Sequence, residues 1–200
     1  MPAVNRHTQR SERTRAALVA TARELFAARG YSEVSTEEVV RAAGVTRGAL
    51  YHQFAGKQEL FRAVLEQVED ELTQRVAATV IETGATDAFA ALHAGVAATL
   101  DASLDPEVVR FTNLAPAVLG WEAWRELGER YGLGLVRASL QAAMDAGTLA
   151  RAQTDPLAQI LLAALEEAML YVARAQDPKR ARAEAGDALG RLVDGLRAGG

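Results

Sequence analysis

GVTRGALYHQFAGKQEL, at residues 44–60, is the stretch that decides the fold of the first third of this 200-residue chain. Within it, Thr46 can cap a short helix whose Leu50 and Phe54 share one face. Arg47 is then turned outward near the start of this helix, where a basic side chain can reach a base edge or a phosphate. The pattern predicts the second helix of a helix-turn-helix, which lies in the major groove of DNA.

The residues before this stretch predict the first helix of the same motif. Ser35 stands three residues before Glu38, a capping-box spacing in which each side chain can bond the other's backbone N–H. Val39 contributes to the apolar side of this short helix. The tight turn that follows needs a residue that tolerates a positive φ, and Gly44 meets that need at little cost.

Helical periodicity continues through the rest of the chain, and no stretch alternates like a strand, so we predict an all-α fold. Apolar residues recur every four positions from Leu60 to Val80, which predicts a rod of roughly 38 Å that joins a head to a body. Three Asp-Pro pairs, at residues 105–106, 155–156 and 177–178, each place a capping carboxylate before a proline. With glycine stops, these signals predict further helices near residues 11–29, 86–103, 105–119, 121–147, 155–175 and 178–197.

Composition excludes several classes of function. The chain has no cysteine, and its three histidines (His7, His52 and His93) are scattered, so we expect no disulfide, no metal site and no cofactor. No Ser, Cys or paired carboxylate stands with a histidine at catalytic spacing, which argues against an enzyme. No run reaches about 18 uninterrupted apolar residues and no signal-peptide pattern begins the chain, so we expect a cytoplasmic protein.

Charge is divided unevenly along the chain. The net charge is −4, but residues 1–62 hold ten Lys and Arg against six Asp and Glu, whereas the remainder holds twelve against twenty. A basic head on an acidic body favours a protein that touches DNA at one end. It disfavours a nonspecific architectural DNA binder, which needs positive charge over much of its surface.

The stretch at residues 44–60 closely resembles the signature of the TetR family of transcriptional regulators, and the resemblance extends over about residues 11–65. It implies a nine-helix homodimer, with a three-helix DNA-binding head at residues 1–56 and a ligand-binding and dimerisation body at residues 57–200. Gln53 stands where the family often has histidine. Carried over by position, the operator contacts are Thr46, Arg47, Tyr51, His52 and Lys57, with Gly48 and Ala49 near bases and Ser35 near a phosphate.

The resemblance implies a repressor that leaves a palindromic operator in double-stranded DNA when a small molecule binds the body. The expected mechanism is a shift of the long helix that tilts the two heads, so that their recognition helices no longer match major grooves about 34–36 Å apart. A regulator that activates transcription, or that acts without a small-molecule inducer, is the alternative.

The body offers candidates for a ligand site and for a subunit interface. Mostly apolar walls are typical of small-molecule sites, so we expect an uncharged or weakly polar, aromatic ligand. Gly132 and Gly134 interrupt a predicted helix, where a close helix crossing, a bound molecule or a kink would explain them. The candidate ligand residues are Phe89, His93, Phe111, Asn113, Trp121, Trp124, Tyr131, Met144, Glu166 and Met169. The candidate interface residues are Leu161, Leu165, Ala185, Leu189, Leu192 and Leu196.

Overall fold

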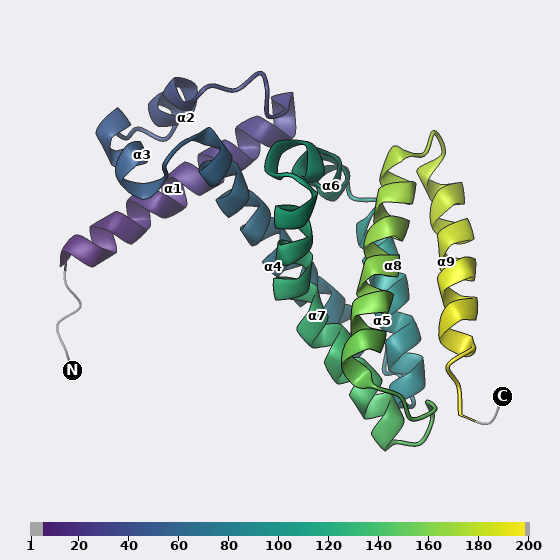
Figure 1. The fold of residues 1–200 in the computed structure, drawn as a ribbon. Coiled ribbons are helices and arrows are strands. Elements are labelled where there is room, and N and C mark those ends of the chain that lie inside the picture. Colours follow the sequence, from purple (N-terminus) through teal and green to yellow (C-terminus); the bar gives the residue numbers. More distant parts are fainter. Residues whose placement is uncertain (1–5, 199–200) are drawn as a thin grey trace.

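The computed structural model describes residues 6–198, and over this range the chain is helical apart from connecting turns and one isolated β-bridge (Figure 1). The side chain of His7 lies outside the described part. The helices of residues 6–198 are α1 (Arg6–Arg29), α2 (Thr36–Ala42), α3 (Arg47–Gln53), α4 (Lys57–Glu82), α5 (Ala88–Ala102), α6 (Pro106–Leu119), α7 (Trp121–Asp145), α8 (Thr154–Arg174) and α9 (Pro178–Asp194).

The all-α fold predicted from the sequence is confirmed, and the predicted helices are present with ends that differ by a few residues. Asp105 caps α6, where its carboxylate accepts the backbone N–H of Glu107 at 2.9 Å. Asp177 caps α9 in the same way, accepting from the backbone N–H of Arg180 at 3.1 Å. Two of the three Asp-Pro pairs therefore act as predicted.

The prediction that Asp155 caps α8 is wrong. This helix begins one residue earlier, at Thr154, and Gln153 at its N-cap makes no side-chain cap bond. The carboxylate of Asp155 instead accepts a hydrogen bond of 2.7 Å from Nε of Arg137 on α7. Asp155 thus lies within the first turn of α8, where a negative charge still favours the positive end of the helix dipole.

Helix α4 leads from the head, formed by α1 to α3, into the body (Figure 1). It packs against α1 on the head side and against α5, α6 and α7 in the body. Its buried residues keep the predicted four-residue spacing, from Leu60 through Val64 and Val68 to Leu72 and Val76. α8 packs against α7 and α9, and α9 forms the outer edge of the body in Figure 1.

The hydrophobic core of the head continues into the body. The ring centroid of Phe26 on α1 lies 5.6 Å from that of Phe61 on α4, which lies 5.9 Å from that of Phe111 on α6. All three side chains are buried in one cluster, which removes a large apolar area from water and stabilises the contact. The domain division at residue 56 stays a prediction, and the first turns of α4 pack as part of the head core.

Within the described chain, α8 is the helix that is long and apolar enough to cross a membrane by length and composition alone. Its residues Leu161, Leu165 and Val172 are buried in the hydrophobic core of the body. Core helices of soluble proteins commonly have this composition, and the packing of α8 explains its apolar character.

Candidate DNA-binding surface and ligand cavity

The turn between α2 and α3 sets the geometry of the helix-turn-helix. Gly44 has a φ of +65°, a left-handed conformation that other residues disfavour, as the sequence predicts. Thr46 Oγ1 accepts a backbone N–H in the first turn of α3 at 3.2 Å, and Ser35 Oγ accepts the backbone N–H of Glu38 at 3.2 Å. The Glu38 carboxylate pairs with Arg29 of α1, so it ties α2 to α1.

The outward face of α3 carries exposed basic and aromatic side chains. Arg47, Tyr51 and His52 are all exposed, and the Arg47 guanidinium lies 5.5 Å from the centroid of the Tyr51 ring. Arg47 also lies 3.7 Å from Glu37 of α2, an exposed ion pair that contributes little energy and leaves Arg47 free to turn toward another acceptor. Gly48 beside it is exposed, and Ala49 is partly buried.

Lys57 occupies a more constrained position at the start of α4. Its ammonium lies 4.2 Å from the centroid of the Tyr31 ring and donates to the carbonyl of Ser32 at 3.5 Å. Partial burial lowers the pKa of Lys57, and the nearby charge of Glu33 opposes this effect. The cation is therefore held beside the N-terminus of a helix, a place that favours a phosphate.

The N-terminal half of α1 extends the same surface. Gln53 Nε2 donates to Ser11 Oγ at 2.7 Å, so this glutamine ties α3 to α1. Arg10, Thr14 and His52 line a shallow surface hollow between these two helices. Arg10 and Thr14 were not predicted as part of this surface, although Arg10 belongs to the basic N-terminal segment that contributes to the positive charge of the head.

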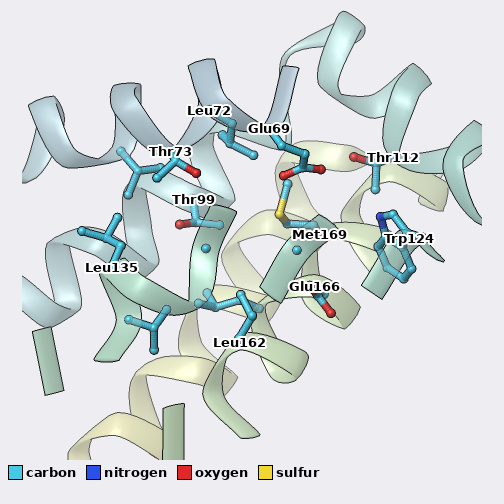
Figure 2. A pocket seen from close by; sticks show the side chains of 15 residues that line it. Glu69, Leu72, Thr73, Thr99, Thr112, Trp124, Leu135, Leu162, Glu166 and Met169 are labelled. Carbon is cyan, nitrogen blue, oxygen red and sulfur yellow. The ribbon is translucent and has the colours of Figure 1, made fainter. Parts of the chain in front are cut away.

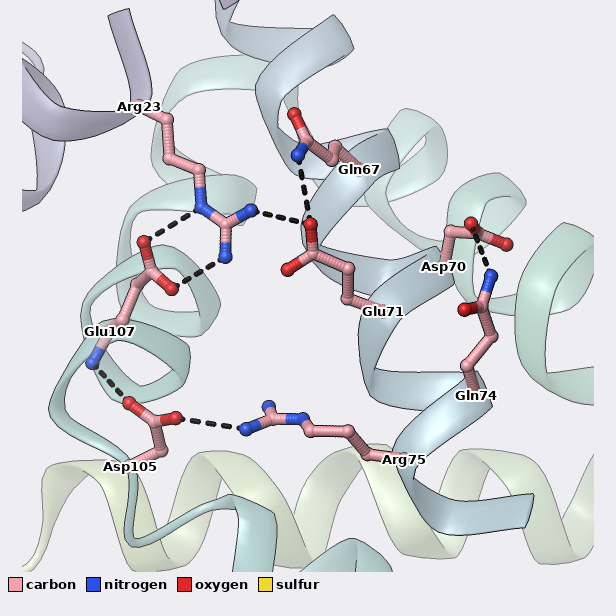
Figure 3. Close-up of polar contacts among 8 residues, drawn as sticks. All are labelled: Arg23, Gln67, Asp70, Glu71, Gln74, Arg75, Asp105 and Glu107. Atoms are coloured by element: carbon pink, nitrogen blue, oxygen red, sulfur yellow. Dashed lines mark hydrogen bonds and ion pairs between the residues drawn. The ribbon is translucent and has the colours of Figure 1, made fainter. Parts of the chain in front are cut away.

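Arg23 on α1 joins the head to two helices of the body (Figure 3). Its Nε and Nη2 donate to the Glu107 carboxylate at 2.8 and 2.7 Å, and its Nη1 donates to Glu71 at 2.8 Å. These bonds raise the pKa of Arg23 above its usual range, and the hydrogen bonding to Glu107 contributes most. Next to them, Asp105 accepts a hydrogen bond of 3.1 Å from Arg75 while it caps α6.

A cavity of about 90 Å³ lies among α4, α5, α6, α7 and α8 (Figure 2). Its wall is mostly apolar and includes Trp124, Met169 and several Leu and Val side chains. The polar groups on the wall are the carboxylates of Glu69 and Glu166 and three threonine hydroxyls. The volume is below the roughly 300–1,000 Å³ of drug-sized sites, so a compact ligand suits it.

Two glycines of α7 allow α8 to approach at this cavity. A Cβ atom on Gly128 would lie 1.9 Å from Oε1 of Glu166, and one on Gly132 would lie 2.9 Å from Cδ1 of Leu162. The close crossing of α7 and α8 therefore explains Gly132. It is one of the three explanations that the sequence leaves open. Gly134 meets nothing within 4 Å, so no contact explains it.

Glu69 and Glu166 carry the charge of the cavity wall, and both residues are partly buried. Burial raises the pKa of each to about 7. The charge of Glu166 raises the pKa of Glu69 further, whereas the charge of Arg125 opposes the rise at Glu166. Among the described residues, neither carboxylate has a hydrogen-bond donor or an ion-pair partner within bonding distance.

Comparisons with known proteins agree with this geometry. The description "Bacterial regulatory proteins, tetR family" matches residues 18–64, and "Tetracyclin repressor-like, C-terminal domain" matches residues 89–196. The chain belongs to the TetR family. It is a TetR-family DNA-binding transcriptional regulator, and its relatives are regulators rather than enzymes.

Individual relatives match over most of their length. The TetC protein of transposon Tn10 from Escherichia coli is 28% identical over 159 residues, which cover 78% of this chain and 79% of TetC. A TetR-family regulator from Pectobacterium atrosepticum is 32% identical, with a TM-score of 0.82 over 94% of this chain and 96% of that one. RolR, solved in complex with resorcinol, shares the fold at 21% identity, with a TM-score of 0.74 over 93% and 90% of the two chains.

Three of the predicted ligand residues line the cavity of this TetR-family protein, namely Trp124, Glu166 and Met169. Phe111 and Met144 do not, because both are buried among other core side chains that fill the space around them. Sequence periodicity marks an inward residue but does not distinguish a filled core from the wall of a cavity.

The remaining predicted ligand residues are engaged elsewhere. His93 Nε2 lies 3.1 Å from Oδ1 of Asp194 on α9, and its ring centroid lies 5.0 Å from that of Phe89. Asn113 Nδ2 donates to the carbonyl of Ala173 at 3.2 Å. Trp121 lies half exposed at the start of α7, and Tyr131 packs against the head cluster.

The predicted interface stays a prediction, and of its residues Leu161, Leu165, Ala185 and Leu189 are buried within the protomer. Leu165 also lines the ligand cavity. Leu192 is 60% exposed, and Leu196 is partly buried. A mostly apolar surface groove between α8 and α9 is lined by Ala164, Glu167, Ala168, Tyr171, Glu184, Ala185, Ala188, Leu189 and Leu192.

Two large exposed side chains on this face of α8 were not predicted. Ile160 is 67% exposed and Tyr171 is 50% exposed. They stand 11 residues apart, which is three helical turns, so they share a face with Ala164 and with the exposed Glu167. The spacing was a usable signal for an exposed apolar stripe.

Proposed function

We propose that this TetR-family protein is a cytoplasmic homodimeric repressor that binds a palindromic operator and is released from it by a small molecule. The observation that carries the proposal is that α4 and α6 take part in both the cavity and the head contact. α4 carries Glu69 at the cavity and Glu71 at Arg23, and α6 carries Thr112 at the cavity and Glu107 at Arg23. A ligand that moves either helix would move the point at which the head is held.

For the DNA contact, we propose that Arg47 reads a base edge while Tyr51, His52 and Lys57 bind phosphates. The exposure of Arg47 near the N-terminus of α3 supports the first role. Ser35 and Thr46 already accept backbone N–H groups, and their exposed hydroxyls can still donate to phosphate oxygens. Gly48 allows close approach of the backbone.

For the dimer, we propose that the α8–α9 groove and the exposed stripe on α8 face a second copy of the chain. Contiguous exposed apolar residues on a soluble protein commonly mark an interface. A short recognition helix reads few base pairs, so two heads held together gain affinity through effective concentration. RolR, which shares this fold, was solved with a small aromatic molecule, and this supports a small-molecule effector.

Selection of DNA from a random pool tests the DNA contact. Arg47→Ala should cost about 1–3 kcal/mol and relax the preference at one position of each half-site, because a base contact is lost. Lys57→Ala should weaken binding to all sequences alike and flatten its salt dependence. Arg110→Ala, at an exposed arginine of α6, serves as the control and should change neither. The same consensus for Arg47→Ala and for the unaltered protein would refute base reading by Arg47.

A reporter gene under the selected operator separates repression from the alternative of activation. Loss of this protein should raise reporter expression if it is a repressor and should lower it if it is an activator. Expression that does not change with any added compound would favour the alternative that no small molecule is involved.

A further inference from the structure

The cavity wall holds two carboxylates and no positive group that neutralises them. Among the described residues that line the cavity there is no Lys, Arg or His. Figure 2 shows Glu69 on one side of the cavity and Glu166 on the other, with Trp124 at its edge. An ionised carboxylate in a mostly apolar wall is costly unless its charge is compensated, and either a proton or a cation from outside the chain can compensate it.

We propose that this cavity binds a compact organic cation, an ammonium group attached to an aromatic or apolar body, with Glu69 and Glu166 as its counter-charges. The inference deepens the proposed function, because it names the chemical class of the effector at the site already described. A cation takes the place of the uncharged ligand that the aromatic residues predict, because Glu69 and Glu166 both line the cavity.

The groups that face the two carboxylates support a cation over the other classes. Arg125 and Glu129 of α7 stand near Glu166, but Arg125 lies 3.7 Å from Glu129 and so its charge is already shared. Tyr131 of α7 is near Glu69 and is neutral at pH 7, since burial raises its pKa. An anionic ligand would meet negative charge, and a neutral apolar ligand would make no use of either carboxylate.

The apolar part of the wall suits the body of such a ligand. Trp124 is buried at the edge of the cavity, and its indole face can interact with an ammonium group. Leu72, Leu135 and Met169 give the surface against which an aromatic or alkyl group packs. Gly128 leaves the space in which the Glu166 carboxylate lies, so the acidic group is accommodated by the backbone of α7.

Affinity for a cation should depend on pH in a defined window. Burial disfavours the charged form of both carboxylates and raises the pKa of each to about 7. A bound cation favours the ionised form, so binding should release protons. We therefore expect affinity to be high at pH 8 and to fall as the pH is lowered through 7.

Titration calorimetry of the full chain with phenyltrimethylammonium tests the proposal. This probe has a fixed charge, so any pH dependence belongs to the protein. The neutral control is tert-butylbenzene, in which carbon replaces nitrogen and the shape is kept. We expect the cation to bind at pH 8, and the Glu69→Gln/Glu166→Gln variant to bind it at least about tenfold more weakly. Asp70→Asn, which removes an exposed charge next to Glu69 in sequence, should bind it as the unaltered protein does.

Two results would overturn the proposal. One is equal affinity of the double variant and the unaltered protein for the cation, with both proteins folded by circular dichroism. The other is tighter binding of tert-butylbenzene than of the cation by the unaltered protein. Operator titration without any compound is run in parallel, because loss of DNA binding would refute the proposed function and leave the cation result standing.

Discussion

The guanidinium of Arg23 in the DNA-binding head holds the carboxylate of Glu107 in the body through two parallel hydrogen bonds, of 2.8 and 2.7 Å. Such a bidentate pair fixes direction as well as distance. Because Glu107 lies in the first turn of α6, the pair links that end of α6 directly to α1.

Arg23→Gln is expected to uncouple the head from the body. The variant leaves Glu107 and Glu71 without their cation, and because both are partly exposed we expect a loss of only about 1 kcal/mol of folding stability. The release of operator DNA by phenyltrimethylammonium should shrink, while operator affinity without ligand stays within a few-fold. Fluorescence anisotropy of labelled operator measures both quantities.

Arg62→Gln is the control for the contact of Arg23 with Glu107 and Glu71, which we call the clamp. Arg62 forms an exposed pair with Glu126 of α7 at 3.4 Å and lies 3.9 Å from Glu66 of α4, so its ion pairs involve no residue of α1 to α3. Its ligand response should remain that of the unaltered protein. If Arg23→Gln and Arg62→Gln respond to the ligand equally well, the clamp does not transmit the signal.

Folding stability should rise as the pH falls from 8 to about 6. The folded protein raises the pKa of Glu69 and of Glu166 from 4.5 to about 7, so between these values it holds protons that the unfolded chain has released. The stabilisation that the protonated pair contributes is therefore fully present below pH 4.5 and is lost as the pH rises through 7. After discounting solvent screening, we expect roughly 2 kcal/mol per group.

Urea unfolding at pH 8 and pH 6 measures this effect. The Glu69→Gln/Glu166→Gln variant should be more stable than the unaltered protein at pH 8, with a smaller difference at pH 6. All other titratable groups are present in both proteins and cancel in the comparison. An equal pH dependence of the two proteins would show that these carboxylates are not perturbed by burial.

Gly128→Ala and Gly134→Ala should differ although both lie in α7. At residue 134 an added methyl meets nothing, so the better helix propensity of alanine should stabilise the protein by about 0.5–1 kcal/mol. At residue 128 the methyl would overlap Oε1 of Glu166, so this carboxylate must leave its position. We expect Gly128→Ala to reduce the binding of phenyltrimethylammonium and Gly134→Ala to leave it unchanged in the same calorimetric titration.

Leu192→Asp is expected to break the dimer without unfolding the protomer. Leu192 is 60% exposed, so in a single chain the charge stays in water and costs little. In the proposed interface it would be buried without a partner, at a cost of several kcal/mol. Sedimentation should show a monomer, and circular dichroism should show that it remains helical. Operator titration should show weakened binding.

Ile81→Asp is the matched control for this substitution. Ile81 is 79% exposed near the end of α4, outside the α8–α9 groove. The protein with this change should remain a dimer. A dimeric Leu192→Asp protein would place the interface elsewhere.

Helix positions could be predicted because their signals are local. Thr46 and Ser35 cap helices through bonds within three residues, and the four-residue repeat in α4 marks the face that is buried. Asp155 departs from its prediction because Arg137, 18 positions away, competes for its carboxylate. Contacts of that kind depend on how helices pack against one another.

The cavity could be predicted only in part for the same reason. Glu69 lies in the acidic run at residues 69–71, a pattern that is typical of a solvent-exposed helix face. It stands four residues after Leu65 and three before Leu72, so its place beside the apolar stripe was the available signal. That Glu69 would meet Glu166 across a cavity depends on the α7–α8 approach at Gly128, which no local pattern reveals.

The aromatic contact from Phe26 through Phe61 to Phe111 limits how this regulator can be recombined with its relatives. A chimera joined at Gly56 would take Phe61 from one parent and Phe26 from the other, so the junction would cut through a packed cluster. A crossover placed after Val68 keeps the first turns of α4 with the head and leaves Phe111 as the main aromatic contact to be matched. To exchange operator specificity, the recognition helix must be replaced and the Phe111 ring must also pack against the head core of the other parent.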